Sequence, residues 1–587
     1  MTESIDDGLV SASDQPFVAP RSVSRASGLF GAHSYHTKVP VEAIRPYVRH
    51  YTTPGAVVLD PFAGSGMTGI ASALEGRQAL LNDLSPAAVH IARNYTTPCD
   101  PLALRRAADR LLSWSLPQIE PLYAATCDSC GALARTEYTI WADLRACPKC
   151  KAEVNVWDSR DRAEGVGSLT CGSCGNQFQK TKAQVTGEVP VQVNLSCQSC
   201  RRSRIVRPPT RDDLALAHWA GDLPYWVPDV PFGPDRPMWR GGHRDLGITN
   251  VTDFWSRRNL FSLSVLWEGI TREPDDRLRD ALRFVFTAML NRASRRYQWN
   301  SKRPTNVLSG TLYIASLRYE FNVLSLFTRK LRAALDLYGA LRLPQGSVRV
   351  SEGSATDLSN VADASVDYCF TDPPFGANIY YADCSLLWES WLGRLTDRSL
   401  EAVVADRFGK SIGDYQAILG GSLAEVARCL RKDGWVTMIF QNTDEKVWSA
   451  LREAAVDAGF GLVLASTLHK SQPSFKGIKA SQNGERIAAS DVVLTLAKSR
   501  QTAVTSFADA DEVVTQAVRQ ELEAFTAGSD RLRSTAHLYA VTVSALVGRG
   551  YDTSGWTFER LDALLARHFE RRLGRWYLKE SRVVGVR

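Results

Sequence analysis

The apolar positions of this chain form short runs that alternate with helical patterns, which is typical of an α/β fold. Ala56–Leu59 and Ala79–Leu81 are apolar runs of strand length, and a helical pattern over Met67–Leu74 stands between them. Val366–Phe370 and Asp491–Ala497 are similar runs much later in the chain. Runs of this kind fit buried parallel strands. The pattern therefore predicts an α/β core whose strands come from two distant parts of the sequence.

Most other segments have helical patterns. Gly247–Ile270 predicts an amphipathic helix capped by Thr252 or Asp253. Trp388 and Trp391 stand at helical spacing, which is more typical of core positions than of a binding site. Further helical patterns cover the region up to about residue 340 and three segments near the end, at 509–526, at 534–547 and after residue 556.

The most informative polar group follows the run that ends at residue 370. Residues 371–376 are Thr-Asp-Pro-Pro-Phe-Gly, on a loop at the carboxyl end of a strand, where open α/β sheets bind ligands. An exocyclic amine of a nucleobase is a poor nucleophile, and Asp372 could activate it by accepting one N–H. Pro373 and Pro374 would fix a backbone carbonyl that accepts the other N–H, and Phe375 offers a face for an extruded base. Taken alone, the motif could equally be a turn.

A second loop supports this interpretation. The sequence Asp-Pro-Phe-Ala-Gly-Ser-Gly-Met-Thr-Gly starts at Asp60. Gly64, Gly66 and Gly69 also satisfy G-x-G-x-x-G, so a nicotinamide or flavin dinucleotide site is an alternative. Asp60 would repel a pyrophosphate but can pair with the ammonium of a methionine group. Asp83, at the end of the next run, can hold ribose hydroxyls in either case. The acid before the glycines favours S-adenosylmethionine.

The two loops resemble those of the amino-directed DNA methyltransferases, in which Asp-Pro-Phe-x-Gly-Ser-Gly is the cofactor loop and Asp-Pro-Pro-Tyr/Phe/Trp is the catalytic loop. His36-Thr37-Lys38-Val39-Pro40 resembles the family's His-x-x-Lys-Pro element, with one residue between Lys38 and Pro40. The segment 353–357 resembles the strand end whose acid meets the cofactor's adenine. Together the resemblance covers residues 30–100 and 345–500.

The resemblance implies a Rossmann-like, S-adenosylmethionine-dependent methyltransferase core that methylates adenine N6 in preference to cytosine N4, because Asp rather than Ser stands at position 372. The cofactor-binding residues that it implies are His36, Lys38, Asp60, Pro61, Phe62, Gly64, Ser65, Gly66, Thr68, Asp83, Ser85 and Asp357. The catalytic residues would be Asp372, Pro373, Pro374 and Phe375, with Asn378 and Tyr381 lining the base pocket.

The order of the motifs departs from the family members that share this wording, in which the catalytic loop comes first. Here the cofactor loop leads, so we expect a permuted core with a domain inserted between its halves. A C5-cytosine methyltransferase would need a nucleophilic cysteine, usually after a proline. Pro98-Cys99 lies just after the second strand, out of reach of a base, and argues against that chemistry.

The insertion begins with four Cys-x-x-Cys pairs. They are Cys127 and Cys130, Cys147 and Cys150, Cys171 and Cys174, and Cys197 and Cys200. Two such pairs complete a tetrahedral Zn²⁺ site, and the gap from Cys130 to Cys147 suits a zinc ribbon. Pairing in sequence order would give two structural zinc ribbons with four cysteine ligands each, and a nested pairing is the alternative. Disulfides are disfavoured because no signal peptide precedes the acidic, polar start, which indicates a reducing cytoplasm.

Two basic segments follow. The first is residues 201–207, for which a nucleic-acid contact and a solvated surface are equally compatible. The second mixes arginines with aromatics, which favours phosphate contact plus stacking. Its candidate residues are Arg292, Arg295, Arg296, Tyr297, Trp299, Lys302 and Arg303.

We therefore expect six parts. They are a flexible tail (1–29), the cofactor-binding half of the core (30–120), two zinc ribbons (121–205), a mostly helical target-recognition region (206–345), the catalytic half (346–502) and a C-terminal helical domain (503–587). The last part ends in a basic group, Arg567, Arg571, Arg572, Arg575 and Lys579, and could contact DNA, a second subunit or another protein.

Composition agrees with this picture. The 587 residues carry a net charge of +7 and are 44% hydrophobic, which suits several domains and a polyanionic partner. Three functions stay open at this point. A DNA amino-methyltransferase leads, an RNA methyltransferase acting on guanine N2 or adenine N6 follows, and the third is a zinc-ribbon nucleic-acid-binding protein with an inactive methyltransferase fold. Restriction–modification, phage defence and housekeeping methylation all fit the first.

Overall fold

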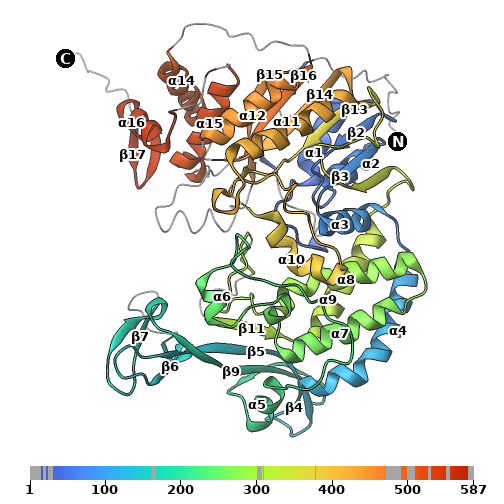
Figure 1. The fold of residues 1–587 in the computed structure, drawn as a ribbon, viewed down its shortest axis with the longest axis vertical. Coiled ribbons are helices and arrows are strands. Elements are labelled where there is room, and N and C mark those ends of the chain that lie inside the picture. The colour runs from blue at the N-terminus through green and yellow to red at the C-terminus, as the bar shows by residue number, and fades with distance from the viewer. Residues whose placement is uncertain are drawn as a thin grey trace, which may run out of the picture.

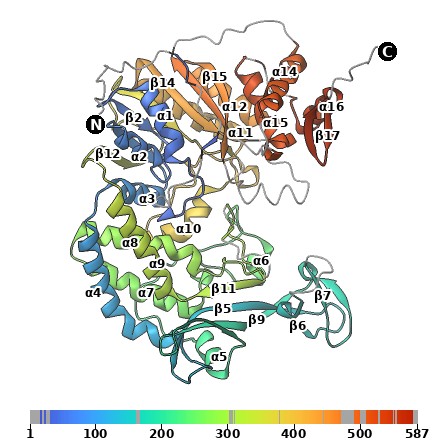
Figure 2. The same cartoon turned by 180° about the vertical axis from the view of Figure 1, so that it is seen from behind.

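The computed structural model of the chain describes residues 15–17, 22–23, 31–159, 167–300, 307–308, 310–376, 379–442, 445–470, 491–498, 509–525, 530–549, 551 and 555–579. Figure 1 shows a core lobe around one large sheet, an inserted lobe of helices with a second sheet, and a C-terminal domain beside the core. Seen from behind in Figure 2, a long arm of paired strands extends from the inserted lobe.

The central sheet has eight strands in the order β1-β15-β16-β14-β13-β2-β3-β12. Its parallel part comprises β2 (Val57–Asp60), β3 (Gln78–Asp83), β12 (Val348–Glu352), β13 (Val366–Thr371) and β14 (Leu430–Phe440). On the other side, β16 (Asp491–Lys498) lies antiparallel between β14 and β15 (Phe460–Lys470), and β1 (Ser22–Val23) pairs with β15. The four strand-like runs in the sequence thus become strands of one mixed sheet.

Alternate residues of the strands enter two separate cores. Val58 and Ile439 pack in one cluster, and Leu59 and Met438 pack in the other. The first cluster includes α1 (Val41–Tyr51), and the second includes α11 (Ile412–Cys429) and α12 (Glu445–Asp457). Helices α2 (Met67–Leu74) and α3 (Pro86–Thr96) follow β2 and β3. A sheet buried on both faces explains why its strands are continuous apolar runs.

The inserted lobe lies between β3 and β12 in the chain. Its long helices are α4 (Pro101–Ile119), α7 (Arg257–Thr271), α8 (Asp276–Ala293) and α9 (Val323–Ala340), with the short α5 (Arg211–Ala217) and α6 (Gly241–Asp245). Helix α4 packs against α7 and α9, so it belongs to this lobe although we expected it in the cofactor half.

The helix predicted from Gly247 begins later than expected. A 3₁₀ turn at Val251–Phe254 comes first, with Asn250 as its cap, and α7 starts at Arg257 with Ser256 accepting from the Asn259 N–H. Thr252 and Asp253 are therefore not the cap of α7, because their segment forms its own turn.

The second sheet forms the arm. Its strands are ordered β10 (Arg202–Arg207), β9 (Val185–Cys197), β5 (Leu133–Ala146) and β11 (Leu317–Phe321), and β4 (Ala124–Thr126) and β6 (Glu153–Asn155) also pair with β5. A small hairpin of β7 (Ser168–Thr170) and β8 (Gln177–Gln179) caps the far end (Figure 1). Strand β11 comes from the region that we expected to be helical, and it ties the arm to the helices.

The C-terminal domain contains the three expected helices, α14 (Ala510–Glu523), α15 (Thr535–Val547) and α16 (Phe558–His568). Helix α15 packs on β15 and β16. A hairpin of β17 (Phe569–Arg572) and β18 (Arg575–Leu578) follows α16 directly, so this domain is not all helical. Within the described residues, no helix is both long and apolar enough to cross a membrane.

Candidate active site

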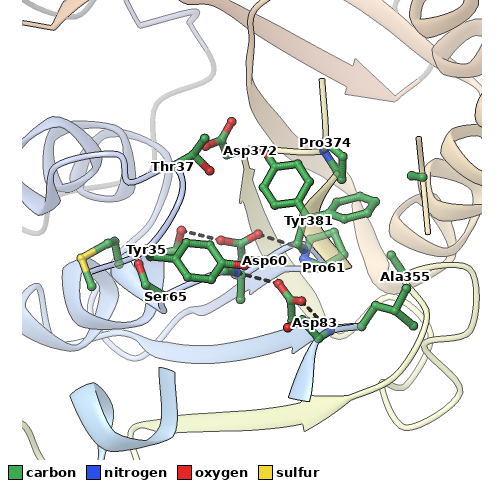
Figure 3. Close-up of a pocket in the computed structure, with 18 of the residues that line it drawn as sticks. Tyr35, Thr37, Asp60, Pro61, Ser65, Asp83, Ala355, Asp372, Pro374 and Tyr381 are labelled. Carbon is green, nitrogen blue, oxygen red and sulfur yellow. Dashed lines mark hydrogen bonds between the residues drawn. The ribbon is translucent and has the colours of Figure 1, made fainter. Parts of the chain in front are cut away.

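A pocket opens where β2, β3 and β13 end. Its lining includes Asp60 at the end of β2, Asp83 at the end of β3, and Asp372 just after β13 (Figure 3). The pocket encloses about 970 Å³, part of it open to solvent. The chain passes from β2 to β3 on one side and returns to β13 on the other, and such a switch point is where open α/β sheets bind ligands.

The pocket brings together most of the sequence-predicted residues. Those that line it are Lys38, Asp60, Pro61, Phe62, Gly64, Ser65, Thr68, Asp83, Ser85, Asp372, Pro374 and Tyr381. His36, Gly66, Asp357, Pro373 and Phe375 are not part of the lining, and Asn378 lies outside the described residues.

The glycine turn requires glycine for steric reasons. Gly64 has φ +50°, and a Cβ there would lie 2.8 Å from Cε1 of Tyr35. Gly66, just before α2, has φ +81°, and a Cβ there would lie 2.9 Å from Cβ of Ala92 on α3. Contacts this short force a neighbour to move, and L-residues avoid this backbone region. The first glycine therefore leaves room beside the pocket, whereas the second allows α3 to pack.

Asp60 joins the two loops. Its carboxylate accepts hydrogen bonds from Oγ1 of Thr68 at 2.6 Å and from Oγ1 of Thr371 at 3.0 Å, and Thr371 directly precedes Asp372. Burial raises the pKa of Asp60 to about 7 despite these donors. A carboxylate held in this way attracts a cation, because the cation restores the stabilisation that burial removes.

Asp83 supports the glycine turn from the next strand. Its oxygens accept from the Gly64 N–H at 2.7 Å and from the Ser85 N–H at 2.9 Å. Burial raises the pKa of Asp83 to about 6. Ser85 caps α3 through the Ala88 N–H, and its hydroxyl donates to Glu389 at 2.6 Å. Asp83 thus lines the pocket and also fixes the shape of its wall.

The loop after β13 is anchored through its carbonyl oxygens. The hydroxyl of Tyr415 donates to the Pro374 carbonyl at 2.7 Å, and the side-chain amide of Asn442 donates to the Phe375 carbonyl at 2.6 Å. The Phe375 ring is 5% exposed and meets Phe440 edge-on, with centroids 5.5 Å apart. This ring therefore belongs to the core, whereas Tyr381, a few residues later in the chain, borders the pocket together with Tyr35 (Figure 3).

The element at residues 36–40 buttresses the pocket. The ring of His36 stacks on Trp388, and burial lowers the pKa of this histidine to about 3. The Lys38 ammonium donates to the His33 carbonyl at 2.7 Å and lies over the Tyr95 ring, and burial lowers its pKa to about 7. Lys38 also lines the pocket, and the His36 ring lies edge-on to Tyr381, so both residues support the pocket wall.

Asp357 lies apart from the other candidates. Its side chain is exposed, and it accepts from the Ser359 N–H. Ser354 and Ala355, in the same loop after β12, line the pocket instead. The expected segment is therefore present, but the structure does not bring its acid to the pocket.

The second basic segment is mostly turned inward. Arg296 is 5% exposed and donates to the carbonyl of Thr311, and Arg295 pairs with Glu188 at 2.5 Å. The Arg292 guanidinium lies over the buried ring of Tyr297. The Trp299 ring packs against Trp157 in the arm, and Lys302 and Arg303 lie outside the described residues. The expected phosphate contact does not fit these positions, because the segment joins the arm to the helices.

The eight paired cysteines form two tetrads, and the pairing is nested. Cys127, Cys130, Cys197 and Cys200 form one tetrad, and Cys147, Cys150, Cys171 and Cys174 form the other. The reason is the antiparallel pairing of β5 with β9, which brings the residues before β5 next to those after β9. Of the two pairings that the spacing left open, the structure has the nested one, with one tetrad at each end of the arm.

The sulfur geometry suits a metal rather than a disulfide. Sγ–Sγ distances within the tetrads include 3.7 Å for Cys127 to Cys200 and 3.5 Å for Cys150 to Cys171. Four thiolates about 2.3 Å from a tetrahedral Zn²⁺ lie about 3.8 Å from one another, whereas disulfide sulfurs are about 2.05 Å apart. Both tetrads can therefore bind a metal ion.

Sequence reasoning missed several contacts of the pocket. Tyr35, Thr371 and Glu401 border it or bond to its acids, and Tyr415 and Asn442 hold the loop after β13. Thr371 directly precedes the Asp-Pro-Pro motif and could have been found there. Tyr35 directly precedes the element at residues 36–40 and could also have been found. Glu401, Tyr415 and Asn442 lie outside every motif, and only the fold brings them to the pocket or to its loop.

Comparison with known proteins confirms the family resemblance for the first part of the chain. Residues 16–94 match the family model of the DNA methylases. Over 78 residues the chain is 42% identical to the type II methyltransferase M.Cfr9I of Citrobacter freundii, which covers 13% of this chain and 25% of that protein. Over 48 residues it is 44% identical to the putative methylase YubD of Escherichia coli K12, covering 8% and 21%. The chain thus matches a quarter or less of the length of these relatives.

Solved structures give weaker likenesses. A geranyl diphosphate C-methyltransferase from Streptomyces coelicolor A3(2) aligns with 30% of this chain and 60% of its own at 10% identity and a TM-score of 0.16. The antibiotic-resistance methyltransferase Kmr aligns with 29% and 71% at 14% identity and a TM-score of 0.15. At such TM-scores neither likeness bears on function.

Proposed function

We propose that this chain, whose first part matches the DNA methylases, transfers a methyl group from S-adenosylmethionine to an exocyclic amine of a DNA base. One observation supports the proposal above all. Asp60 and Asp372, separated by most of the chain, line the same pocket and are joined through Thr371. Methyl transfer needs this arrangement. Asp60 offers a site for the positively charged cofactor, Asp372 can accept an N–H of the target amine, and both line the same pocket.

The cofactor side of the pocket fits S-adenosylmethionine. When bound, this cofactor supplies a methyl group on a positively charged sulfur. Asp60 provides a buried negative charge for its ammonium, and the glycine turn with Asp83 provides the wall for the ribose and adenine. The absence of a Cβ at Gly64 keeps this wall open beside Tyr35.

The acceptor side is the loop from Asp372 to Phe375. The Asp372 carboxylate accepts one N–H of the target amine and the Pro373 carbonyl accepts the other, which makes the nitrogen lone pair available for attack. The two prolines set the direction of this carbonyl, and the bonds from Tyr415 and Asn442 hold the loop in place. Because the Phe375 ring is buried, we assign the stacking face for an extruded base to Tyr381.

We propose adenine N6 as the first target and cytosine N4 as the second. Asp at position 372 favours adenine, as the resemblance implies. The alternatives are an RNA methyltransferase and an inactive zinc-ribbon protein that binds nucleic acid. The intact pair of acids argues against inactivity, since a chain that only bound nucleic acid would not need Asp60 and Asp372 to line one pocket.

For the arm, we propose a structural Zn²⁺ ion in each tetrad. Each ion would hold together an end of the arm that has only a small apolar cluster of its own. In the part of the chain that the structure describes, the tetrads lie on the inserted lobe, outside the lining of the pocket. The ions would therefore support the shape of the arm and take no part in the reaction.

Product analysis tests the proposal. The chain is incubated with methyl-labelled S-adenosylmethionine and either duplex DNA or RNA, and the nucleic acid is digested to nucleosides for mass spectrometry. We expect labelled N6-methyldeoxyadenosine from DNA and no label in RNA. Labelled N4-methyldeoxycytidine would show that cytosine is the target base. Label in the RNA would favour the RNA methyltransferase. Cofactor binding without any label would favour the inactive nucleic-acid-binding protein.

A further inference from the structure

The hairpin of β17 and β18 carries three features that cost folding free energy at one place. The first is its turn, Leu573-Gly574, whose φ angles are +49° and +75°. Positive φ at both central residues defines the tight hairpin turn that favours Asn-Gly. A leucine there is strained, because its Cβ lies too close to a backbone carbonyl oxygen in the left-handed conformation.

The second feature is the exposure of this leucine. The Leu573 side chain is 102% exposed, whereas most leucines of the chain are buried or half-buried. Within the described residues its side chain gains no packing from the rest of the chain. A single exposed leucine is common, but one that also strains the backbone at a protruding tip suggests a function outside the fold.

The third feature is a pair of like charges. Arg572 and Arg575 lie directly opposite each other across the hairpin, next to the turn, and such pairs destabilise a sheet. Glu570 pairs with Arg572 at 2.7 Å, and Asp562 pairs with Arg571 at 3.1 Å. These ion pairs are partly exposed and therefore weak, so phosphate oxygens can replace the carboxylates.

The base of the hairpin is packed against the C-terminal domain, which fixes the position of the tip. Phe569 and Trp576 are each 2% exposed, and the Trp576 indole donates to Thr535 at 2.9 Å. From Gly555 to Lys579 there are six basic and three acidic side chains. In Figures 1 and 2 the hairpin lies at the outer end of the C-terminal domain. The hairpin therefore projects from the domain with basic side chains along it and the apolar Leu573 at its tip.

We propose that this hairpin is a second DNA-binding element, which inserts Leu573 into the minor groove while the flanking arginines contact phosphates. Apolar wedges between arginines are a known way to enter and kink the minor groove. The choice of DNA as the partner rests on the proposed function. A second copy of the chain is the competing occupant, and the test separates the two.

Two variants test the proposal because they should not weaken the fold. Leu573→Asn removes the wedge and places a residue that accepts the left-handed backbone. The double variant Arg572→Gln/Arg575→Gln removes the opposed charges. Matched controls are Leu133→Asn, at another exposed leucine, and Arg105→Gln/Arg106→Gln, at exposed arginines of α4.

The measurements are thermal stability, affinity for a labelled duplex as a function of salt, and duplex bending by energy transfer between labelled ends. We expect both hairpin variants to melt no lower than the wild type. The arginine variant should bind DNA roughly tenfold more weakly, with a salt slope smaller by about 2. Leu573→Asn should lose the bend, and the controls should retain affinity and bend.

Two outcomes would overturn the inference, and a third would separate it from the proposed function. Unchanged DNA affinity and bending in both hairpin variants would exclude DNA contact at this site. Loss of self-association by light scattering, without loss of DNA binding, would identify the hairpin as a contact between copies. If the wild type binds and bends the duplex but never methylates it, the proposed function fails while the hairpin assignment stands.

Discussion

The pocket and the arm assemble distant residues in different ways. In the pocket, Asp60 and Asp372 face one space because the sheet places β2 beside β13, and a buried hydrogen bond from Thr371 to Asp60 links the two strand ends. In the arm, each tetrad meets at one end of the β5–β9 pair, beside a small apolar cluster. The pocket is therefore a product of the fold alone, whereas we expect the ends of the arm to depend on their ions.

This difference predicts that the two regions fail independently. Substitutions in the pocket should abolish chemistry without unfolding the arm, and removal of metal should disorder the arm without abolishing cofactor binding. The following predictions test this separation, beginning with the largest effect.

Removing the acceptor acid should have the largest effect. Asp372→Ala should lower the rate of methyl transfer by roughly a thousandfold or more, because the target amine loses the group that activates it. Affinity for S-adenosylmethionine, measured by calorimetry, should change by less than about twofold. Substantial remaining activity would show that another residue activates the amine, and Asp372→Asn, which keeps one acceptor oxygen, is the matched control.

Adding a side chain to the glycine turn should weaken cofactor binding. In Gly64→Ala the new Cβ would lie 2.8 Å from the Tyr35 ring in a left-handed backbone, and we expect roughly 10- to 100-fold weaker cofactor binding. Gly66→Val should abolish binding, and because its side chain must displace Ala92 on α3, its melting temperature should fall further than that of Gly64→Ala. Wild-type affinity in Gly64→Ala would place the cofactor elsewhere.

Metal content distinguishes the two pairings of the cysteines. In the nested arrangement, Cys130→Ser/Cys200→Ser damages one tetrad, so bound zinc measured by mass spectrometry should fall from two ions to one. In the sequential arrangement the same double variant would damage both sites and leave none. Cys130→Ser/Cys150→Ser is the matched control, because it damages both tetrads of the nested arrangement but only one site of the sequential one. We expect it to bind no zinc. Both variants should still bind the cofactor.

The pocket should couple cofactor binding to pH. Burial raises the pKa of Asp60 to about 7, so the free carboxyl is protonated at a pH where an ordinary aspartate is ionised. A bound ammonium favours the ionised form, so binding should release a proton and strengthen up to about tenfold per pH unit as pH rises toward 7. Calorimetry in buffers of different ionisation enthalpy measures the released proton. The Asp60→Asn variant should bind the cofactor weakly, and its affinity should lack the pH dependence that the Asp60 carboxyl causes.

The smallest effect concerns the anchor of the catalytic loop. Tyr415→Phe removes the hydrogen bond to the Pro374 carbonyl, and we expect a fall in kcat of about threefold to tenfold with unchanged cofactor affinity. An equal change in cofactor affinity would instead indicate a general loss of packing around α11.

The sequence indicated several residues that the structure places at the pocket. Acids at strand ends and glycines at a turn are signatures of short segments, and Asp60, Gly64, Asp83 and Asp372 lie at the pocket as their motifs indicated. The helix after the glycine turn also begins at Met67, as its pattern indicated.

What the sequence could not predict depends on contacts between distant segments. The spacing of cysteines indicates ligands but not which pairs meet, because the β5–β9 pairing decides this. Arg296 and Phe375 have side chains suited to DNA and to a base, yet packing turns both inward. Ser256 rather than Thr252 caps α7, because the preceding 3₁₀ turn occupies the earlier residues.

A crystal structure of the chain with S-adenosylmethionine and a target duplex would test the central claim most directly. We predict the cofactor's ammonium at the Asp60 carboxylate, its methyl group toward Asp372, and the target amine between Asp372 and the Pro373 carbonyl. A cofactor bound away from the glycine turn, or a target base that never reaches Asp372, would contradict the account.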